Sequence, residues 1–161
     1  MSPPLSQRLL LSRLVGAEVD FVLVGGLAVA AHGFVRATED VDLVYSTQAA
    51  SCERFSSALA ELGAEVTFAD TPEPGAGITA EWLAAGGHFR FSTEAGPLDA
   101  LSAIHGLRYE ELASRAVGSS LGDLDLLICS YEDLIAMKTA GGRDRDEIDL
   151  SELRRINDPG R

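Results

Sequence analysis

The segment Gly25–Leu43, GGLAVAAHGFVRATEDVDL, is the most informative part of this 161-residue chain. It begins where an apolar, β-prone run at residues 20–24 meets two glycines, and it ends inside a second such run at residues 41–45. Glycines at a strand-to-helix turn let a phosphate approach the backbone, and the first N–H groups of a helix carry a partial positive charge. We therefore expect Gly25 and Gly26 to border a phosphate-binding site.

Two aspartates near the end of this segment suggest a metal site. Asp40 and Asp42 flank Val41 at the edge of the predicted strand, so their side chains should share one face. Carboxylates this close repel each other unless cations lie between them, and Mg²⁺, or Mn²⁺ in its place, suits such oxygen ligands. Asp99 lies in another apolar run, Leu98–Leu101, where an unpaired carboxylate is costly to bury. Three such carboxylates would hold two cations about 3.5–4 Å apart for an in-line displacement.

The remaining sequence predicts alternating helices and strands. Residues 70–87, which include two prolines and several glycines, are expected to form an irregular loop or lid around a short helical piece near Trp82. We expect one domain over residues 1–161, of mixed α/β (α+β) class, with a small mixed central sheet flanked by helices. Helices are expected at 5–15, 27–32, 48–62, 108–115, and, as the C-terminal pair, 130–140 and 146–156; strands are expected at 20–24, 41–45, 65–68, 88–93, 98–101 and 124–129.

The predicted hairpin at residues 88–101 bears on the environment of Asp99. If Thr93 pairs with Leu98, Ser92 lies opposite Asp99 and shares a face with His88 and Arg90. Arg90 would then neutralise Asp99 or touch the substrate. The other two histidines, His32 and His105, show no ligand spacing, so we expect them to be structural or exposed.

Composition and charge exclude several classes of protein. The net charge of −12 argues against a protein that coats long nucleic acid, because such binding depends on neutralising phosphates. No apolar run approaches the ~20 residues of a membrane span, and the first 14 residues lack the features of a signal peptide. Cys52 and Cys129 match no metal or redox spacing, so we expect reduced thiols and a cytoplasmic protein.

Taken together, these motifs resemble the nucleotidyltransferase fold of the DNA polymerase β superfamily, and most closely the small bacterial abortive-infection (AbiEii-like) toxins of toxin–antitoxin pairs. The family pattern is a strand, a Gly-Gly or Gly-Ser pair, an Asp-x-Asp and a later strand aspartate. In this sequence the pattern corresponds to Gly25, Gly26, Asp40, Asp42 and Asp99. The Arg-x-Thr of the family corresponds to Arg36-Ala37-Thr38, and the C-terminal motif of the family corresponds to Lys138, Arg143, Asp146 and Asp149. Gly26 departs from the many catalytic members that have serine there.

The resemblance implies transfer of a nucleoside monophosphate from an NTP to a hydroxyl of a tRNA, a protein or a small molecule, with release of pyrophosphate. Asp40 and Asp42 would hold both metals, while Asp99 would hold the metal that activates the acceptor or take the acceptor's proton. Phosphate binding is implied for Gly25, Gly26, Arg36, Thr38, Lys138 and Arg143, with Arg90, Asp146 and Asp149 in supporting roles. A partner protein encoded nearby is also expected for such a protein.

Two alternatives follow from the same sequence. Residues 118–122, GSSLG, fit the Gly-x-Ser-x-Gly pattern of a hydrolase nucleophile elbow, but a strand-like run follows and no histidine comes later, so we expect a turn. The second alternative is an inactive nucleotidyltransferase-like protein that serves as a binding or toxin–antitoxin partner, because a fold does not guarantee its chemistry. Whether Asp99 converges with Asp40 and Asp42 distinguishes this alternative from an enzyme.

Overall fold

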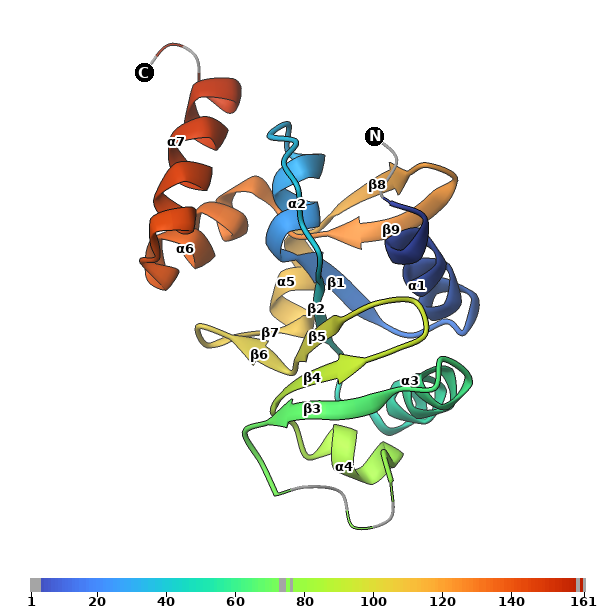
Figure 1. Ribbon diagram of the computed structural model, residues 1–161. Coiled ribbons are helices and arrows are strands. Elements are labelled where there is room, and N and C mark those ends of the chain that lie inside the picture. The colour runs from blue at the N-terminus through green and yellow to red at the C-terminus, as the bar shows by residue number, and fades with distance from the viewer. Residues whose placement is uncertain (1–3, 73–74, 76, 159, 161) are drawn as a thin grey trace.

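The computed structural model describes residues 4–72, 75, 77–158 and 160, and within them it shows a mixed seven-stranded sheet with the order β3-β4-β5-β2-β1-β9-β8 (Figure 1). A separate two-stranded ribbon pairs β6 with β7. The strands are β1 Phe21–Val24, β2 Val41–Tyr45, β3 Glu65–Ala69, β4 His88–Ser92, β5 Leu98–Leu101, β6 Ala103–Ile104, β7 Leu107–Arg108, β8 Val117–Leu121 and β9 Leu124–Ile128. The helices are α1 Leu5–Gly16, α2 Gly25–Ala31, α3 Ala49–Glu61, α4 Ala80–Ala84, α5 Tyr109–Arg115, α6 Tyr131–Gly141 and α7 Asp144–Asn157.

The sheet separates an apolar core from a polar face. Alternate residues of β2, such as Leu43 and Tyr45, are fully buried, and the Tyr45 ring packs 5.2 Å from that of Phe55 on α3. On β4, Phe89 faces the same core and stacks 4.2 Å from Trp82 of α4. Because strand side chains alternate, Asp42 on β2 points to the opposite face of the sheet. The pleat therefore places this carboxylate outside the packed core.

The strand pairing brings Asp42 beside Asp99. β1 and β2 run antiparallel, whereas β2 and β5 run parallel with Asp42 opposite Asp99 and Leu43 opposite Ala100. Parallel pairing of β2 with β5 follows from the long excursion of the chain through α3, β3 and β4 between them. The register thus sets the two carboxylates side by side.

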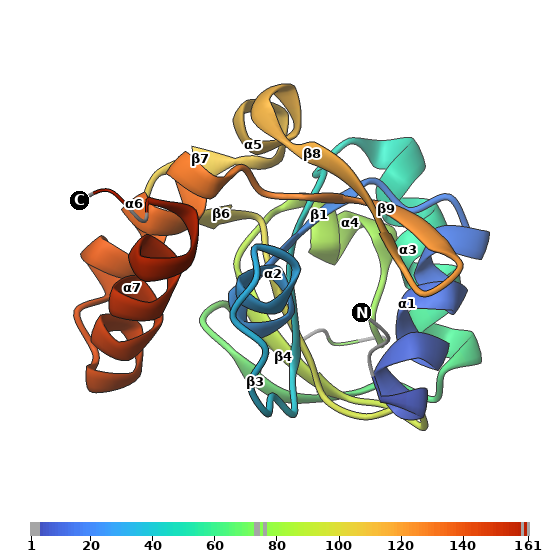
Figure 2. The same ribbon diagram turned by 90° about the horizontal axis from the view of Figure 1, so that it is seen from above.

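The helices lie in separate groups around the sheet. Figure 2 shows α1 and α3 together at one side of the molecule and α6 and α7 at the opposite side. α6 begins at a side-chain cap, in which the Ser130 hydroxyl accepts a hydrogen bond of 3.0 Å from the backbone N–H of Asp133. No helix in the described part of the chain combines the length and apolar character that crossing a membrane requires.

Most expected elements are confirmed, but two details of the sequence interpretation are wrong and one element was missed. Helix α1 is confirmed, and its buried face is Gln7, Leu10, Leu11 and Leu14. The run 118–122 is not a turn: most of it belongs to β8, and the turn is at Gly122–Asp123. The β6–β7 ribbon was not anticipated.

The second error is the register of the β4–β5 hairpin. Arg90, not Ser92, lies opposite Asp99, which is a shift of two residues that keeps Arg90 and His88 on the expected face. Ser92 pairs instead with Glu65 on β3, and the connection closes through the Thr93 hydroxyl, which donates to the carbonyl of Gly96 at 2.6 Å. Of the irregular segment expected at 70–87, residues 73, 74 and 76 lie outside the described part of the chain.

Candidate active site

A pocket of about 580 Å³ opens on the polar face of the sheet. This volume lies within the range of small-molecule sites. It receives residues from the β1–α2 turn, the loop before β2, strands β4 and β5, the β6–β7 ribbon and helix α6. Of the residues singled out from the sequence, the pocket is lined by Gly25, Gly26, Arg36, Thr38, Asp40, Asp42, Arg90, Asp99, Lys138, Arg143 and Asp146; Asp149 lies behind it.

The turn between β1 and α2 requires glycine at position 25. Gly25 has a φ of +68°, a conformation that side-chain-bearing residues rarely adopt. A Cβ built there would also overlap Oδ2 of Asp42. The carboxylate of Asp42 therefore lies directly against the backbone of the turn, and its charge is stabilised by the backbone N–H of Gly26.

We expect Gly25→Ala to destabilise the protein by at least about 1–2 kcal/mol, the cost of a left-handed conformation, because the added methyl group also displaces the Asp42 carboxylate. Urea unfolding measures the loss. Gly16→Ala at the end of α1 is the matched control, since no heavy atom lies within 4 Å of the added Cβ. Equal stability of the two variants would contradict this account of the turn.

Gly26 and Thr38 fit against each other. A Cβ at Gly26 would lie 2.6 Å from Oγ1 and 2.8 Å from Cβ of Thr38, which is closer than real contacts allow. The Thr38 side chain thus occupies the space that a serine at position 26 would need. At Gly26, where many catalytic members of the family have serine, the Thr38 side chain therefore brings a hydroxyl from the loop before β2.

The carboxylates of the pocket shift the pKa of Asp42. Burial, and then the negative charges of Asp99 and Asp40, raise the pKa of Asp42 to about 7, while Lys138 and the Gly26 N–H oppose the rise. A divalent cation against Asp42 would remove this repulsion. The donor set therefore fits a hard cation, with Asp40 and Asp42 as the residues that would hold it.

Asp99 is held by two neighbours on β4. Its Oδ1 lies 2.5 Å from Nε2 of His88, and its Oδ2 lies 3.6 Å from Nε of Arg90. Among the residues described, no three acidic, histidine or cysteine side chains gather closely enough to form a ligand shell for a metal. The three aspartates line one pocket, but Asp99 contacts His88 and Arg90 instead of forming a cation site together with Asp40 and Asp42.

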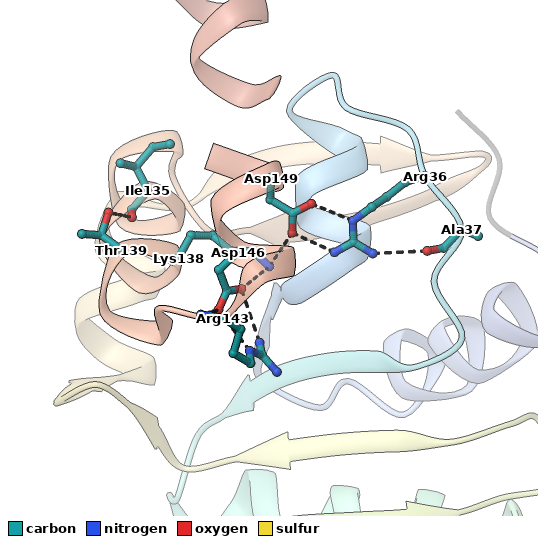
Figure 3. Close-up of polar contacts among 8 residues, drawn as sticks. All are labelled: Arg36, Ala37, Ile135, Lys138, Thr139, Arg143, Asp146 and Asp149. Carbon is teal, nitrogen blue, oxygen red and sulfur yellow. Dashed lines mark hydrogen bonds and ion pairs between the residues drawn. The ribbon is translucent and has the colours of Figure 1, made fainter. Parts of the chain in front are cut away.

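The cationic side of the pocket is organised by two aspartates of α7 (Figure 3). Lys138 is only 7% exposed, and its Nζ lies 3.2 Å from Oδ1 of Asp146 and 2.8 Å from Oδ2 of Asp149. Arg36 donates two hydrogen bonds of 2.8 Å to the two oxygens of Asp149. Arg143 contacts Asp146 at 3.0 Å. The three cations thus meet two buried carboxylates, which leaves an excess of one positive charge beside Asp42.

This network keeps its carboxylates ionised. Burial by itself would raise the pKa of Asp149, but hydrogen bonds from Arg36 and Lys138 hold that pKa below its ordinary value. The Asp149 hydrogen bonds in turn raise the pKa of Arg36. Asp146 and Asp149 therefore orient the cations, and Asp149, although expected in a supporting role, pairs with Arg36 as well as with Lys138.

Sequence reasoning missed part of the pocket wall. Ile104 and His105 reach it from the β6–β7 ribbon, and Leu101 reaches it from β5. His105 is exposed, as expected, yet lines the pocket because it has a φ of +48° at the tip of the ribbon, next to Gly106 with a φ of +80°. Two successive residues with positive φ, the second of them a glycine, are typical of a tight hairpin turn. The sequence Ile-His-Gly-Leu is therefore the pattern from which this turn could have been predicted.

Comparisons with known proteins agree with this geometry. The sequence profile of the family described as "Nucleotidyl transferase AbiEii toxin, Type IV TA system" matches residues 8–148. No curated protein matches the sequence. At the level of the fold, the chain is similar to the lincosamide antibiotic adenylyltransferase LnuA, with 15% identity and a TM-score of 0.66 over 96% of this chain and 98% of that one.

Two further solved structures share the fold. The antibiotic-resistance factor ANT(2'')-Ia is 16% identical, with a TM-score of 0.61 over 94% of this chain and 84% of that one. TM1012 from Thermotoga maritima is 13% identical, with a TM-score of 0.60 over 94% of each chain. At identities this low, the similarity to these structures establishes the fold alone. The family match covers most of the sequence and therefore establishes the family. The chain therefore belongs to the AbiEii family of nucleotidyl transferase toxins of type IV toxin–antitoxin systems.

Proposed function

We propose that the chain transfers a nucleoside monophosphate from an NTP to a hydroxyl acceptor in this pocket, with Mg²⁺ or Mn²⁺ as the metal. The observation that carries the proposal is the pairing of Asp42 with Asp99 across β2 and β5, directly beside the Gly25 turn. The acceptor oxygen would form a bond to the α-phosphorus while the bond to the β-phosphate oxygen breaks, so that pyrophosphate leaves. The acceptor proton would pass to Asp99.

The residues divide into two functional sets. Divalent cations bound by Asp40 and Asp42 would neutralise triphosphate charge, which is the chemistry that such ions supply in phosphoryl transfer. Arg36, Lys138 and Arg143 would stabilise phosphate oxygens from the opposite wall, and the Thr38 hydroxyl would donate to them. Each of these cations already has a carboxylate partner that orients it. His88 and Arg90 fix the orientation of Asp99.

The candidate acceptors are a tRNA, a protein and a small molecule. Two structural neighbours are described with antibiotics, LnuA with bound lincomycin and ANT(2'')-Ia in complex with adenylyl-2''-tobramycin, which makes a small hydroxyl compound one candidate class. The toxin–antitoxin family supports a partner protein encoded nearby. Both cysteines are free and buried, which fits a cytoplasmic protein.

A second candidate function is that of an inactive binding or toxin–antitoxin partner protein. The contacts of Asp99 with His88 and Arg90 favour it, because they hold this carboxylate against its neighbours on β4 rather than against a cation shared with Asp40 and Asp42. The two functions make opposite predictions for labelling of an acceptor.

The test is incubation with α-labelled ATP, CTP, GTP or UTP and Mg²⁺ in a cell extract, followed by identification of the labelled product. We expect one or more NTPs to label an acceptor and chelation of the metal to stop the labelling. Thermal unfolding with Mn²⁺ and each NTP gives an independent readout, because a ligand at 100 times its Kd adds about 2.7 kcal/mol of stability. Neither label nor shift with any NTP would favour the inactive partner.

A further inference from the structure

The segment between α2 and β2 carries side chains of both functional sets but has no regular secondary structure. Residues 34–40 are neither helix nor strand, yet they present Arg36, Thr38 and Asp40 to the pocket. Such a segment depends on side-chain anchors, because the hydrogen-bond pattern of a helix or sheet does not hold it in place. Arg36 is anchored to Asp149 on α7. The anchor of Thr38 lies in a part of the chain for which the sequence suggested no functional role.

That anchor is Gln7 on α1. Its side chain is 3% exposed, and its Nε2 donates a hydrogen bond of 2.9 Å to the backbone carbonyl of Thr38, which is 31 residues away. Its Oε1 is buried and finds no hydrogen-bond partner among the residues described. The other buried positions of this helix are leucines, Leu10, Leu11 and Leu14.

A glutamine at this position is therefore poorly explained by stability. Burying an amide oxygen without a partner costs free energy, and an apolar side chain of similar shape avoids that cost. The single hydrogen bond of Gln7 acts on the segment that carries the site. It fixes the Thr38 backbone, and with it the side chain packed over Gly26 and the position of Asp40 two residues later.

We propose that Gln7 is a positioning residue for the nucleotidyl-transfer site, acting through the Thr38 carbonyl. This inference rests on the proposed function, because it assigns Gln7 a role in holding the residues that bind metal and phosphate. The family match begins at residue 8, so Gln7 lies just outside the region that the family profile covers. Helix α1 is then a support of the site as well as a part of the core.

The test compares Gln7→Met with Leu14→Val in the full chain. Methionine keeps the length of glutamine and removes both the donor and the unpaired oxygen, so we expect Gln7→Met to unfold at the same or a higher urea concentration than the wild type. It should nevertheless weaken Mn²⁺ binding, followed by the electron paramagnetic resonance signal of free Mn²⁺, by about tenfold, as is typical when a support of a metal ligand is lost. Leu14→Val should show the reverse, with lower stability and Mn²⁺ affinity within about twofold of the wild type.

Hydrogen exchange of the backbone amides at residues 34–40 separates failure of this inference from failure of the proposed function. Gln7→Met should accelerate exchange in this segment, while Leu14→Val should not accelerate it selectively. Unchanged exchange and unchanged Mn²⁺ affinity in Gln7→Met would overturn the positioning role. If the wild type bound no Mn²⁺, the metal assignment would fail, and accelerated exchange in Gln7→Met would still show that Gln7 positions the segment.

Discussion

Asp42→Asn is expected to abolish nucleotidyl transfer while making the metal-free protein more stable at pH 8. The activity is lost because Asp42 lies at the centre of the site, between the glycine turn and Asp99. An amide retains the shape of the carboxylate but lacks the charge that a divalent cation needs. Labelling with α-labelled NTP measures the loss, and retained labelling would refute the role of Asp42 in holding metal.

The gain in stability follows from the pKa of Asp42, which rises from 3.8 to about 7 on folding. A carboxyl group with a raised pKa in the folded state stabilises the protein fully below pH 3.8, and this contribution is lost as the pH rises through about 7. Asparagine does not ionise, so the Asp42→Asn variant does not lose this stability as the pH rises. We expect its Tm in a chelator at pH 8 to exceed that of the wild type by several degrees, since about 1 kcal/mol corresponds to roughly 2–4 °C.

The matched control is Asp125→Asn on β9, an exposed aspartate whose carboxylate bonds to the Ser120 hydroxyl and lies outside the pocket. This variant should keep full activity and should not gain stability with rising pH. The difference in Tm between Asp42→Asn and the wild type should shrink as the pH falls toward 4. A Tm for Asp42→Asn at or below that of the wild type at pH 8 would contradict the proposed electrostatic strain.

Asp149→Ala is expected to cost about 3–5 kcal/mol of stability, which is typical when one partner of a buried ion pair is removed. Asp149 is fully buried and pairs with both Arg36 and Lys138 at 2.8 Å. Its loss leaves Lys138, itself 7% exposed, with Asp146 alone and leaves Arg36 without its bidentate partner. Urea unfolding measures the cost.

The exposed Glu147 on the same helix supplies the control, because Glu147→Ala should change stability by no more than about 0.5 kcal/mol. Lys138→Met combined with Asp149→Ala should cost less than the sum of the two single changes, since the pair is coupled. Additive costs would mean that the two charges do not depend on each other. A small cost for Asp149→Ala alone would mean that α7 does not hold the cations in place.

The sequence predicted the frame of the site because its signals are local. Apolar runs ended by glycine set the strands and helices, and the spacing of Asp40 and Asp42 set the face of β2. The β4–β5 register was wrong by two residues because it depends on the length of the connection and on pairing of Ser92 with β3, neither of which a local pattern reveals. The shift of two preserved the face, so Arg90 still contacts Asp99.

The long-range contacts of the site were beyond local reasoning. Asp146 and Asp149 were expected in supporting roles beside Lys138 and Arg143, but the burial of Lys138 and the pairing of Asp149 with Arg36 depend on how α7 packs. The link from Gln7 to Thr38 joins residues 31 apart and depends on the packing of α1. These features arise from tertiary packing, which places distant side chains together without leaving a periodic signal in the sequence.

Diffraction from crystals soaked with Mn²⁺ and a non-hydrolysable NTP tests the central claim most directly. Anomalous scattering should show Mn²⁺ within coordination distance of Asp40 and Asp42, with two ions about 3.5–4 Å apart if the two-metal chemistry applies. The triphosphate should lie between these ions and the Arg36–Lys138 wall. Nucleotide bound elsewhere, or no manganese at Asp42 while Asp99 stays with His88, would contradict the account.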